Sequence, residues 1–263
     1  MKKVGIIIPV INCWDKYTLP LIQSIPESLR SDILIVDNAS SDDTQKEATA
    51  GGYKYIRNDK NIGCAASWNQ GVRYFYDRDY DYFLILNNDV LIPMQSIPAL
   101  VERFERPDAR IMLISMHNVR GTIENPRDVL ILPADCKKDV PESEGPDFSA
   151  FMISRRTWEI IGEFDEGFYP AYFEDNDYHY RIKVGGFIAI NYPNAFYYHF
   201  GSGTQNQGPA PVVNGQMFEM NRMYYMQKWG GVPGNEKWKT PGNHQDKNYR
   251  WTKQKGRTTH TTL

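Results

Sequence analysis

The sequence predicts one α/β domain with a central, mostly parallel sheet flanked by helices. Two observations lead to this fold class. Apolar runs of strand length alternate with stretches of helical spacing through short connections, as in the right-handed crossovers of a parallel sheet. Polar residues also follow the ends of four of these runs. A chain of 263 residues with 41% hydrophobic residues can bury such a core, and no linker divides it.

The first half of the chain alternates regularly between the two kinds of element. Strands are predicted at residues 4–10, 33–36, 53–57 and 82–86, and helical regions at 17–29, 43–50 and 62–76. Pro20 and Pro26 interrupt the first helical region, because proline cannot donate a helical hydrogen bond. Ser40, Ser41 and Asp42 are candidate N-caps of the second.

The second half is less regular. Strands are predicted at residues 111–116, 149–154, 187–190 and 195–198, and helices at 174–184 and 212–229. Gly185 and Gly186 end the first of these helices. The segment 121–145 is rich in Pro, Asp and Lys, so we expect it to be a surface excursion.

Polar side chains at the ends of the first four strands indicate a binding cleft. They are Asn12, Asp37, Asn38, Asn58, Asn61 and Asp89. A single Asn or Asp at a strand end often only forms a turn. Four successive strand ends of this kind indicate a ligand site, because ligands of open α/β sheets bind at the carboxyl ends of the strands.

The composition excludes several classes of protein. The longest apolar run near the start, residues 4–11, is too short for a membrane span or a signal segment. Cys13, Cys64 and Cys136 form neither a zinc pattern nor a disulfide framework, so we expect a reducing, cytoplasmic setting. A formal charge of −2 argues against wholesale nucleic-acid binding.

The last residues differ from the rest in charge. From residue 237 onward there are seven Lys and Arg residues and one acid, Asp246. We therefore predict a domain over residues 1–236 and a basic tail over 237–263. The tail is either solvated and partly disordered, or an arm in weak contact with an anionic acceptor or a membrane surface.

Three carboxylates crowd the start of the predicted helix 174–184: Glu174, Asp175 and Asp177. One interpretation is structural, because acids favour a helix N-terminus and Asp177 is spaced to pair with Arg181. The other is functional, because neighbouring carboxylates raise each other's pKa and need a reason to be adjacent.

A phosphate ligand would need a counter-charge other than a glycine-rich loop, because no Gly-x-Gly-x-x-Gly or Walker motif is present. Asp89, which follows Asn87 and Asn88, offers hard oxygen ligands for Mg²⁺ or Mn²⁺, with substrate phosphates completing the shell. His199 stands in a Gly- and Ser-rich stretch at a strand end. It is either a metal or phosphate ligand or an ordinary buried histidine.

Over residues 3–230, several motifs resemble the inverting glycosyltransferase family 2, whose GT-A fold is a single Rossmann-like domain. They occur in the family's order: residues 8–12 (IPVIN), 35–42 (IVDNASSD), 58–63 (NDKNIG) with Ala65 and Asn69, 86–89 (LNND), 173–177 (FEDND), His199, and Asn221, Tyr224 and 228–230 in a closing helix. Asn87 replaces the first acid of the family's metal motif. This variant resembles the rhamnosyltransferase-like branch.

The resemblance implies a role for each motif. Asp175 would be the general base, with Glu174 and Asp177 orienting the site, while Asp89 and His199 would hold Mn²⁺ or Mg²⁺. A pocket for the donor nucleotide would be formed by Pro9, Val10, Asn12, Asp37, Asn58, Asn61, Gly63, Asn69, Asn87 and Asn88. Asp37 would accept a hydrogen bond from the base N–H, which favours a UDP- or dTDP-sugar.

The implied reaction moves a sugar to a hydroxyl of a glycan or another acceptor. Sugar selectivity is expected to depend on Trp68, Asn87 and the segment 117–147. Acceptor choice is expected to depend on that segment, the aromatic cluster 168–173 and the tail. A sugar-1-phosphate nucleotidyltransferase is an alternative, although its glycine-rich basic loop is missing after the first strand. A non-catalytic glycan- or nucleotide-binding scaffold is another, and a transferase acting on nucleic-acid bases a further subclass.

Overall fold

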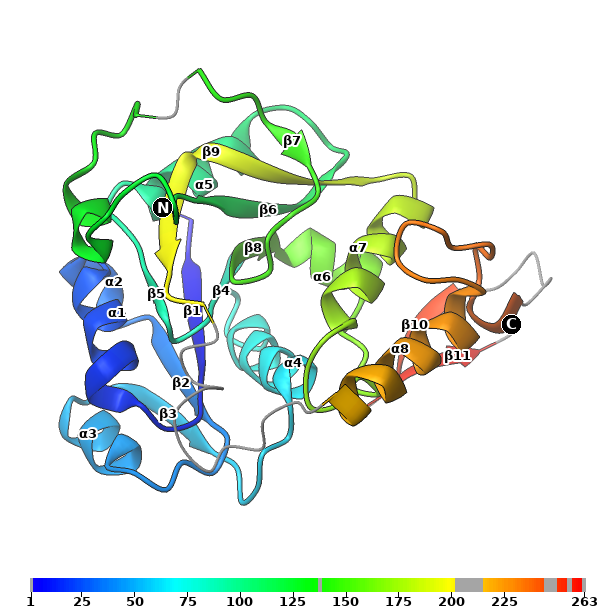
Figure 1. The fold of residues 1–263 in the computed structure, drawn as a ribbon, viewed down its shortest axis with the longest axis horizontal. Coiled ribbons are helices and arrows are strands. Elements are labelled where there is room, and N and C mark those ends of the chain that lie inside the picture. Colours follow the sequence, from blue (N-terminus) through cyan, green and yellow to red (C-terminus); the bar gives the residue numbers. More distant parts are fainter. Residues whose placement is uncertain (1, 137–138, 202–214, 244–249, 255–256, 262–263) are drawn as a thin grey trace.

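The computed structural model describes residues 2–136, 139–201, 215–243, 250–254 and 257–261. Within these residues, the central sheet has nine strands in the order β3-β2-β1-β4-β8-β6-β9-β5, and β7 pairs with β9 (Figure 1). The strands are β1 (Val4–Val10), β2 (Ile33–Asp37), β3 (Lys54–Arg57), β4 (Tyr82–Leu86), β5 (Val90–Leu91), β6 (Ile111–Asn118), β7 (Ser143–Glu144), β8 (Ala150–Ser154) and β9 (Ile188–His199).

The sheet is parallel in its first half and mixed in its second. β3, β2, β1 and β4 are parallel to one another, as the alternation of strands and helices predicts. β8 lies antiparallel between β4 and β6. The chain reaches β8 from β6 through residues 119–149 without a crossover helix, and a parallel neighbour would need such a crossover. β6 and β9 are again parallel.

Helices cover both faces of this sheet. They are α1 (Leu19–Ser24), α2 (Glu27–Arg30), α3 (Thr44–Ala50), α4 (Cys64–Tyr76), α5 (Ser96–Glu105), α6 (Arg155–Ile161), α7 (Glu174–Val184) and α8 (Gly215–Trp229), with short turns η1 (Trp14–Thr18), η2 (Pro126–Ile131) and η3 (Pro241–Asn243). Alternate residues of each strand face opposite sides. Ile6 and Ile8 pack with α1, α3 and α5, whereas Ile7 packs with α4, α6 and α7.

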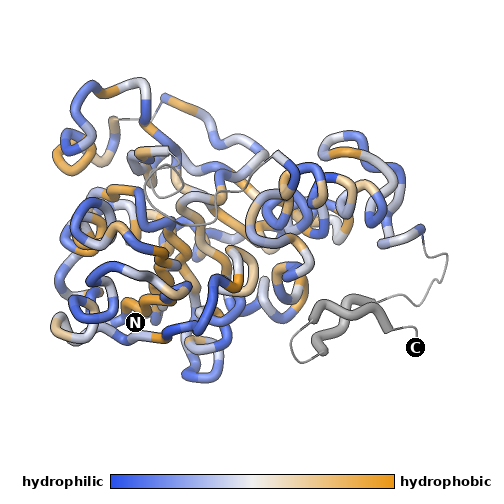
Figure 2. The backbone as a smooth tube through the Cα atoms, turned by 60° about the horizontal axis from the view of Figure 1, so that its bottom comes forward, coloured by the Kyte–Doolittle hydropathy of each residue, from blue (hydrophilic) through white to orange (hydrophobic). Residues whose placement is uncertain are grey.

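The hydrophobic stretches gather in the strands, and hydrophilic stretches surround them (Figure 2). This arrangement follows from the apolar runs, because β1, β2 and β4 are almost entirely buried. Of the candidate N-caps, Asp42 accepts a hydrogen bond from the Thr44 N–H at 3.1 Å, next to the N-cap position Asp43. No helix in the described part of the chain is long and apolar enough to cross a membrane.

Two predicted strands, 187–190 and 195–198, form the single strand β9. Its pairing with β6 shifts between Tyr192 and Phe196, so residues 193–195 form an irregularity. Pro193 lies there, where a missing N–H does no harm to the ladder. The predicted helix 212–229 is described from Gly215 onward, and residues 212–214 lie outside the described part.

The predicted tail contains a further pair of strands, β10 (Arg250–Gln254) and β11 (Arg257–Thr261), which are antiparallel. Before them, the N–H groups of Lys237 and Trp238 donate to the Trp229 carbonyl at the end of α8. Residues 244–249, 255–256 and 262–263 lie outside the described part. The division of the chain at residue 236 stays a prediction.

Candidate active site

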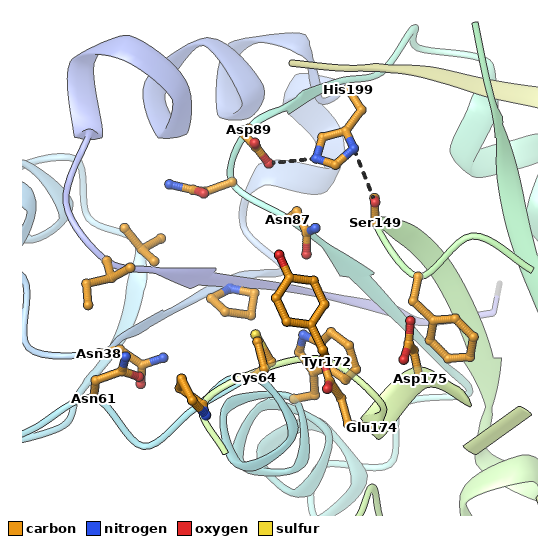
Figure 3. A pocket seen from close by; sticks show the side chains of 18 of the residues that line it. Asn38, Asn61, Cys64, Asn87, Asp89, Ser149, Tyr172, Glu174, Asp175 and His199 are labelled. Atoms are coloured by element: carbon orange, nitrogen blue, oxygen red, sulfur yellow. Dashed lines mark hydrogen bonds and ion pairs between the residues drawn. The ribbon is translucent and has the colours of Figure 1, made fainter. Parts of the chain in front are cut away.

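A cavity of about 340 Å³ opens at the carboxyl ends of the parallel strands. Its walls come from the end of β1, the turn after β4, the loop before β8, the start of α4 and the start of α7 (Figure 3). Nine of the residues predicted for the site line it: Pro9, Val10, Asn61, Asn87, Asn88, Asp89, Glu174, Asp175 and His199. The predicted cleft and this cavity therefore coincide.

Asp89 and His199 form a pair on one side of the cavity (Figure 3). His199 Nε2 lies 3.1 Å from Asp89 Oδ1, and its Nδ1 lies 3.3 Å from Ser149 Oγ. Their proximity follows from the short antiparallel pairing of β5 with β9, in which Val90 is opposite His199. Ser149 thus fixes the orientation of the imidazole, as hydrogen-bond partners of metal-binding histidines commonly do.

The donor atoms of this pair fit a divalent cation such as Mn²⁺ or Mg²⁺. A buried carboxylate and an imidazole are ligands that such ions accept, and the Asn87 side chain lines the same wall. Among the described residues, no group of three or more His, Cys, Asp or Glu side chains could hold a metal ion. A cation here would therefore need substrate oxygens to complete its shell.

Asp175 lies at the start of α7 and faces the cavity. The Asn176 N–H donates to its Oδ1 at 2.7 Å. Burial raises the pKa of Asp175 above its ordinary value, and hydrogen bonds from the backbone N–H groups of the helix start oppose that rise. A partly buried carboxylate with a raised pKa can accept a proton from a neighbouring hydroxyl.

The loop before Asp175 is held in an unusual conformation. Tyr172 and Phe173 both have positive φ, 77° and 74°, which is uncommon for aromatic residues. Asn221 of α8 donates from Nδ2 to the carbonyls of Ala171 at 2.8 Å and Tyr172 at 3.3 Å. These bonds attach α8 to the loop and so fix the position of the α7 start.

Asp177 does not line the cavity but connects α7 to α8. Its carboxylate accepts hydrogen bonds from Arg181 Nε at 2.9 Å and Trp229 Nε1 at 2.8 Å. Lys228 Nζ lies 2.6 Å from Asp177 Oδ1 and 2.6 Å from Asp165 Oδ2. The predicted pairing with Arg181 is thus present, within a larger buried network.

Three residues predicted for the nucleotide pocket do not line the cavity, but they form hydrogen bonds to the segments that do. Asn12 Oδ1 accepts from the Ser41 N–H at 2.7 Å and so joins two strand-end loops. The fully buried Asp37 accepts from the Ser40 N–H at 2.8 Å and from the side chains of Tyr55 and Arg57. Asn58 Nδ2 donates to Asn38 Oδ1 at 3.1 Å, and it is Asn38 that lines the cavity.

Gly63 and Asn69 act in the same indirect way. Gly63 has φ +86°, and a Cβ there would lie 2.9 Å from the Pro170 carbonyl oxygen. Asn69 exchanges two hydrogen bonds with the Phe164 backbone, at 2.8 and 2.9 Å. Both residues therefore bring the loop before α7 against α4.

Several cavity residues had no motif to mark them. Cys64, Phe148 and Ser149 line the cavity, and none was predicted as a site residue. Trp68 and Asp147, which lie where sugar selectivity was expected, also line it. Asp147 accepts from the Tyr197 hydroxyl at 2.5 Å and from the Ser149 N–H at 2.9 Å. The only sequence signal for Ser149 is its place at the start of a predicted strand.

Comparison with known families identifies the chain. Residues 5–161, more than half of the chain, match the family Glycosyl transferase family 2. The chain belongs to glycosyltransferase family 2. This result agrees with the resemblance that the motifs of the chain show. The chain's assignment to the rhamnosyltransferase-like branch stays a prediction.

Two curated relatives of this family 2 member are each 27% identical to it. Galactofuranosyl glycosyltransferase of Leishmania donovani aligns over 210 residues, which is 65% of this chain and 48% of the relative. The low-salt glycan biosynthesis hexosyltransferase Agl10 of Haloferax volcanii aligns over 168 residues, which is 58% of this chain and 53% of the relative. The aligned parts are thus about half the length of these relatives.

Solved structures show that the family 2 chain has the GT-A fold. GalNAc-T7 with UDP, GalNAc and Mn²⁺ superposes with a TM-score of 0.60 at 14% identity, over 87% of this chain and 49% of that one. The mannosyltransferase PcManGT of Pyrobaculum calidifontis with GDP-Man and Mn²⁺ superposes with a TM-score of 0.54 at 16% identity, over 84% and 70%.

Proposed function

We propose that this glycosyltransferase inverts the anomeric carbon of a nucleotide-sugar while transferring the sugar to a hydroxyl of a glycan or another acceptor. The observation that carries the proposal is that one cavity contains both Asp175 and the Asp89–His199 pair. The first is a base for the acceptor, and the second is a cation site for the leaving group. Two structural neighbours contain UDP or GDP-Man together with Mn²⁺, which supports the cation site.

Asp175 is the general base in this mechanism. It takes the proton of the acceptor hydroxyl as that oxygen attacks the anomeric carbon from the face opposite the diphosphate. The new carbon–oxygen bond forms while the bond to the diphosphate oxygen breaks, and the nucleoside diphosphate leaves with the bonding electrons. A single displacement of this kind inverts the configuration.

Asp89 and His199 would hold Mn²⁺ or Mg²⁺ against the diphosphate. When bound, such a cation supplies Lewis-acid stabilisation of the negative charge on the leaving group. Ser149 keeps the imidazole in the orientation that directs Nε2 towards Asp89. The buried Asp89 carboxylate and His199 thus act on the leaving group, at the opposite side of the reacting carbon from Asp175.

The nucleoside would lie against the end of β1 and the residues Asn38 and Asn61. We favour a UDP- or dTDP-sugar, with Asp37 accepting a hydrogen bond from the base N–H. Asp37 is fully buried next to Asn38 in the sequence, and its carboxylate already accepts hydrogen bonds from Ser40, Tyr55 and Arg57. A base contact would use a remaining lone pair of that carboxylate.

The basic tail would add weak contact with an anionic acceptor or a membrane surface. The surplus of Lys and Arg after residue 236 supports this contact. A cytoplasmic location with membrane association would follow. A steep fall of acceptor affinity with salt would distinguish such contact from a tail that binds nothing.

The proposed function is tested by thermal-shift measurements on the purified chain. UDP, dTDP, GDP and CDP and their sugars are screened with and without Mn²⁺ or Mg²⁺. A ligand that binds only the folded protein raises its melting temperature. We expect one nucleotide class to do so in a metal-dependent manner. An unchanged melting temperature with every nucleotide and metal would contradict the proposal.

A further inference from the structure

The carboxylate of Glu174 is buried without a complete set of partners. The residue is 5% exposed, and its Oε2 has no hydrogen-bond partner among the described residues. Among the described residues, Glu174 Oε2 is the one buried side-chain oxygen or nitrogen atom that has no hydrogen-bond partner. An unpaired polar group inside a protein is unfavourable, so a case of this kind calls for an explanation.

The surroundings of Glu174 are otherwise well paired. Asp177, one helical turn later, is bound by Arg181, Trp229 and Lys228. Glu163 is bound in a two-pronged ion pair by Arg73. None of the described cations forms an ion pair with Glu174. The missing partner is therefore not a general feature of this region.

Glu174 lines the cavity, on the side formed by α4. It lies beside Cys64 and next in sequence to Asp175, and away from the Asp89–His199 pair (Figure 3). A carboxylate at this place would repel the diphosphate, so Glu174 is not a ligand for that group. It is also more buried than Asp175, which must remain accessible to an incoming acceptor.

We propose that Glu174 is a specificity residue that binds one hydroxyl of the donor sugar. The inference rests on the proposed function, because it needs a nucleotide-sugar in the cavity. A hydroxyl suits this position because it both donates and accepts a hydrogen bond. In the proposed mechanism the donor sugar lies between the diphosphate and Asp175, and Glu174, the more buried of the two adjacent carboxyl groups, lines the same cavity.

The protonation of Glu174 is compatible with this role. Burial and, secondly, the charge of Asp175 raise the pKa of Glu174 well above its ordinary value. A neutral carboxyl can donate its O–H to a sugar oxygen and accept a hydrogen bond through its other oxygen. Of the two adjacent carboxyl groups, only Asp175 then carries a negative charge, where the base is needed.

The test measures how removal of one sugar hydroxyl and removal of Glu174 combine. The probe is whichever of UDP-glucose, UDP-galactose, dTDP-rhamnose or GDP-mannose stabilises the chain most, with its monodeoxy analogues and its sugar-free nucleoside diphosphate. Dissociation constants are measured by titration calorimetry. In the wild type, we expect one monodeoxy analogue to bind at least about tenfold more weakly than its parent.

In Glu174→Ala, the difference in affinity between the parent nucleotide-sugar and this monodeoxy analogue should fall to about twofold or less. The affinity for the nucleoside diphosphate should stay unchanged. Glu174→Leu keeps the side-chain volume and should retain the fold, and we expect it to show the same reduced difference in affinity as Glu174→Ala. Glu163→Gln is the matched control, because Glu163 is buried but paired outside the cavity, and it should keep the difference. Persistence of the tenfold difference in both Glu174 variants would overturn the inference, as would its absence from the wild type. Failure of the wild type to bind any nucleotide would instead refute the proposed function.

Discussion

At the scale of single residues, Asp175 combines access to the cavity with a raised pKa. Replacing it by Asn keeps the shape but removes the proton acceptor. We expect Asp175→Asn to lower the transfer rate by about 10²- to 10⁴-fold and to leave nucleotide affinity unchanged. A direct transfer assay and calorimetry measure the two quantities. Full activity of the variant would refute the base assignment.

The same carboxylate predicts the pH dependence of transfer. Burial raises the pKa of Asp175, and only the ionised form accepts a proton. The rate, kcat/KM, should therefore rise with pH until it passes a pKa above the ordinary value for Asp, about 3.9. A pH–rate profile of the wild type measures this value. A rate that falls over the same acidic range as pH rises would contradict it.

The ionised Glu174 carboxylate should reduce the stability of the ligand-free protein. Its pKa is raised in the folded state, so the folded protein loses stability as pH rises from the unfolded value, about 4.3, through the folded value. Glu174→Gln does not ionise. We expect its melting temperature to exceed that of the wild type at pH 7 by more than at pH 4. If Glu174→Gln and the wild type had the same melting temperature at pH 7 and also at pH 4, the prediction would be wrong, because the Glu174 carboxylate would then have hydrogen-bond partners in the ligand-free protein.

Sequence motifs predicted several of the residues that line the cavity, but not the direction in which every side chain points. Asp89, Asp175 and His199 line the cavity as predicted, because each follows a strand or begins a helix at the sheet edge. Asp37 and Asn38 are adjacent at one strand end, and a motif cannot decide which of them faces inward. The ion pair of Asp37 with Arg57, 20 residues away, decides it.

At the scale of elements, Lys228 of α8 pairs with two buried carboxylates, Asp177 of α7 and Asp165 of the segment before α7. Burial tends to raise the pKa of Asp165, but the charge and hydrogen bond of Lys228 outweigh it and lower the pKa. Lys228→Met would remove the buried cation that pairs with Asp165 and Asp177. We expect a loss of about 3–5 kcal/mol in the free energy of unfolding, measured by urea denaturation.

Arg222 on the same helix provides the control. Its ion pair with Glu219 is on the surface, so Arg222→Ala should change the free energy of unfolding by no more than about 1 kcal/mol. A similar loss in the two variants would mean that the buried network does not stabilise the contact between α7 and α8.

The approach of α4 to the loop before α7 depends on Gly63. Gly63→Ala places a methyl group 2.9 Å from the Pro170 carbonyl, in a backbone conformation with positive φ. Gly52 also has a positive φ, but a Cβ there would have no atom within 4 Å. We expect Gly52→Ala to destabilise by about 1 kcal/mol through strain. Gly63→Ala should destabilise more, because Gly63 has φ 86° and ψ 170°, a conformation that is nearly restricted to glycine, and it alone should weaken transfer. Equal activity of the two variants would contradict this role.

The strands could be predicted more accurately than the helices for a physical reason. Buried parallel strands are continuous apolar runs, and β1 and β4 begin and end at the predicted residues. α5 and α6 were not predicted, since α5 contains Pro98 and α6 has only seven residues. The two-residue strand β5 exists only through its pairing with β9, and no local pattern signals it.

At the scale of the whole molecule, the Asp89–His199 pair joins the parallel and mixed halves of the sheet. If Asp89 and His199 hold a cation against the diphosphate, EDTA should weaken binding of the nucleoside diphosphate by about tenfold or more and leave the nucleoside unaffected. Asp89→Ala should reproduce the loss, and EDTA should add nothing to it. Calorimetry with both ligands measures this. Equal binding with and without EDTA would contradict the cation site.

The contact between Asp89 and His199 also has a consequence for folding. The two residues are 110 positions apart, and His199 is the last residue of β9. Pairings between distant segments form slowly, because closing a long loop costs chain entropy before any contact compensates for it. We therefore expect cation affinity to develop only when β9 has joined the sheet. Release of the ion would then be an early sign of local unfolding, while the wall beside β1 is still intact.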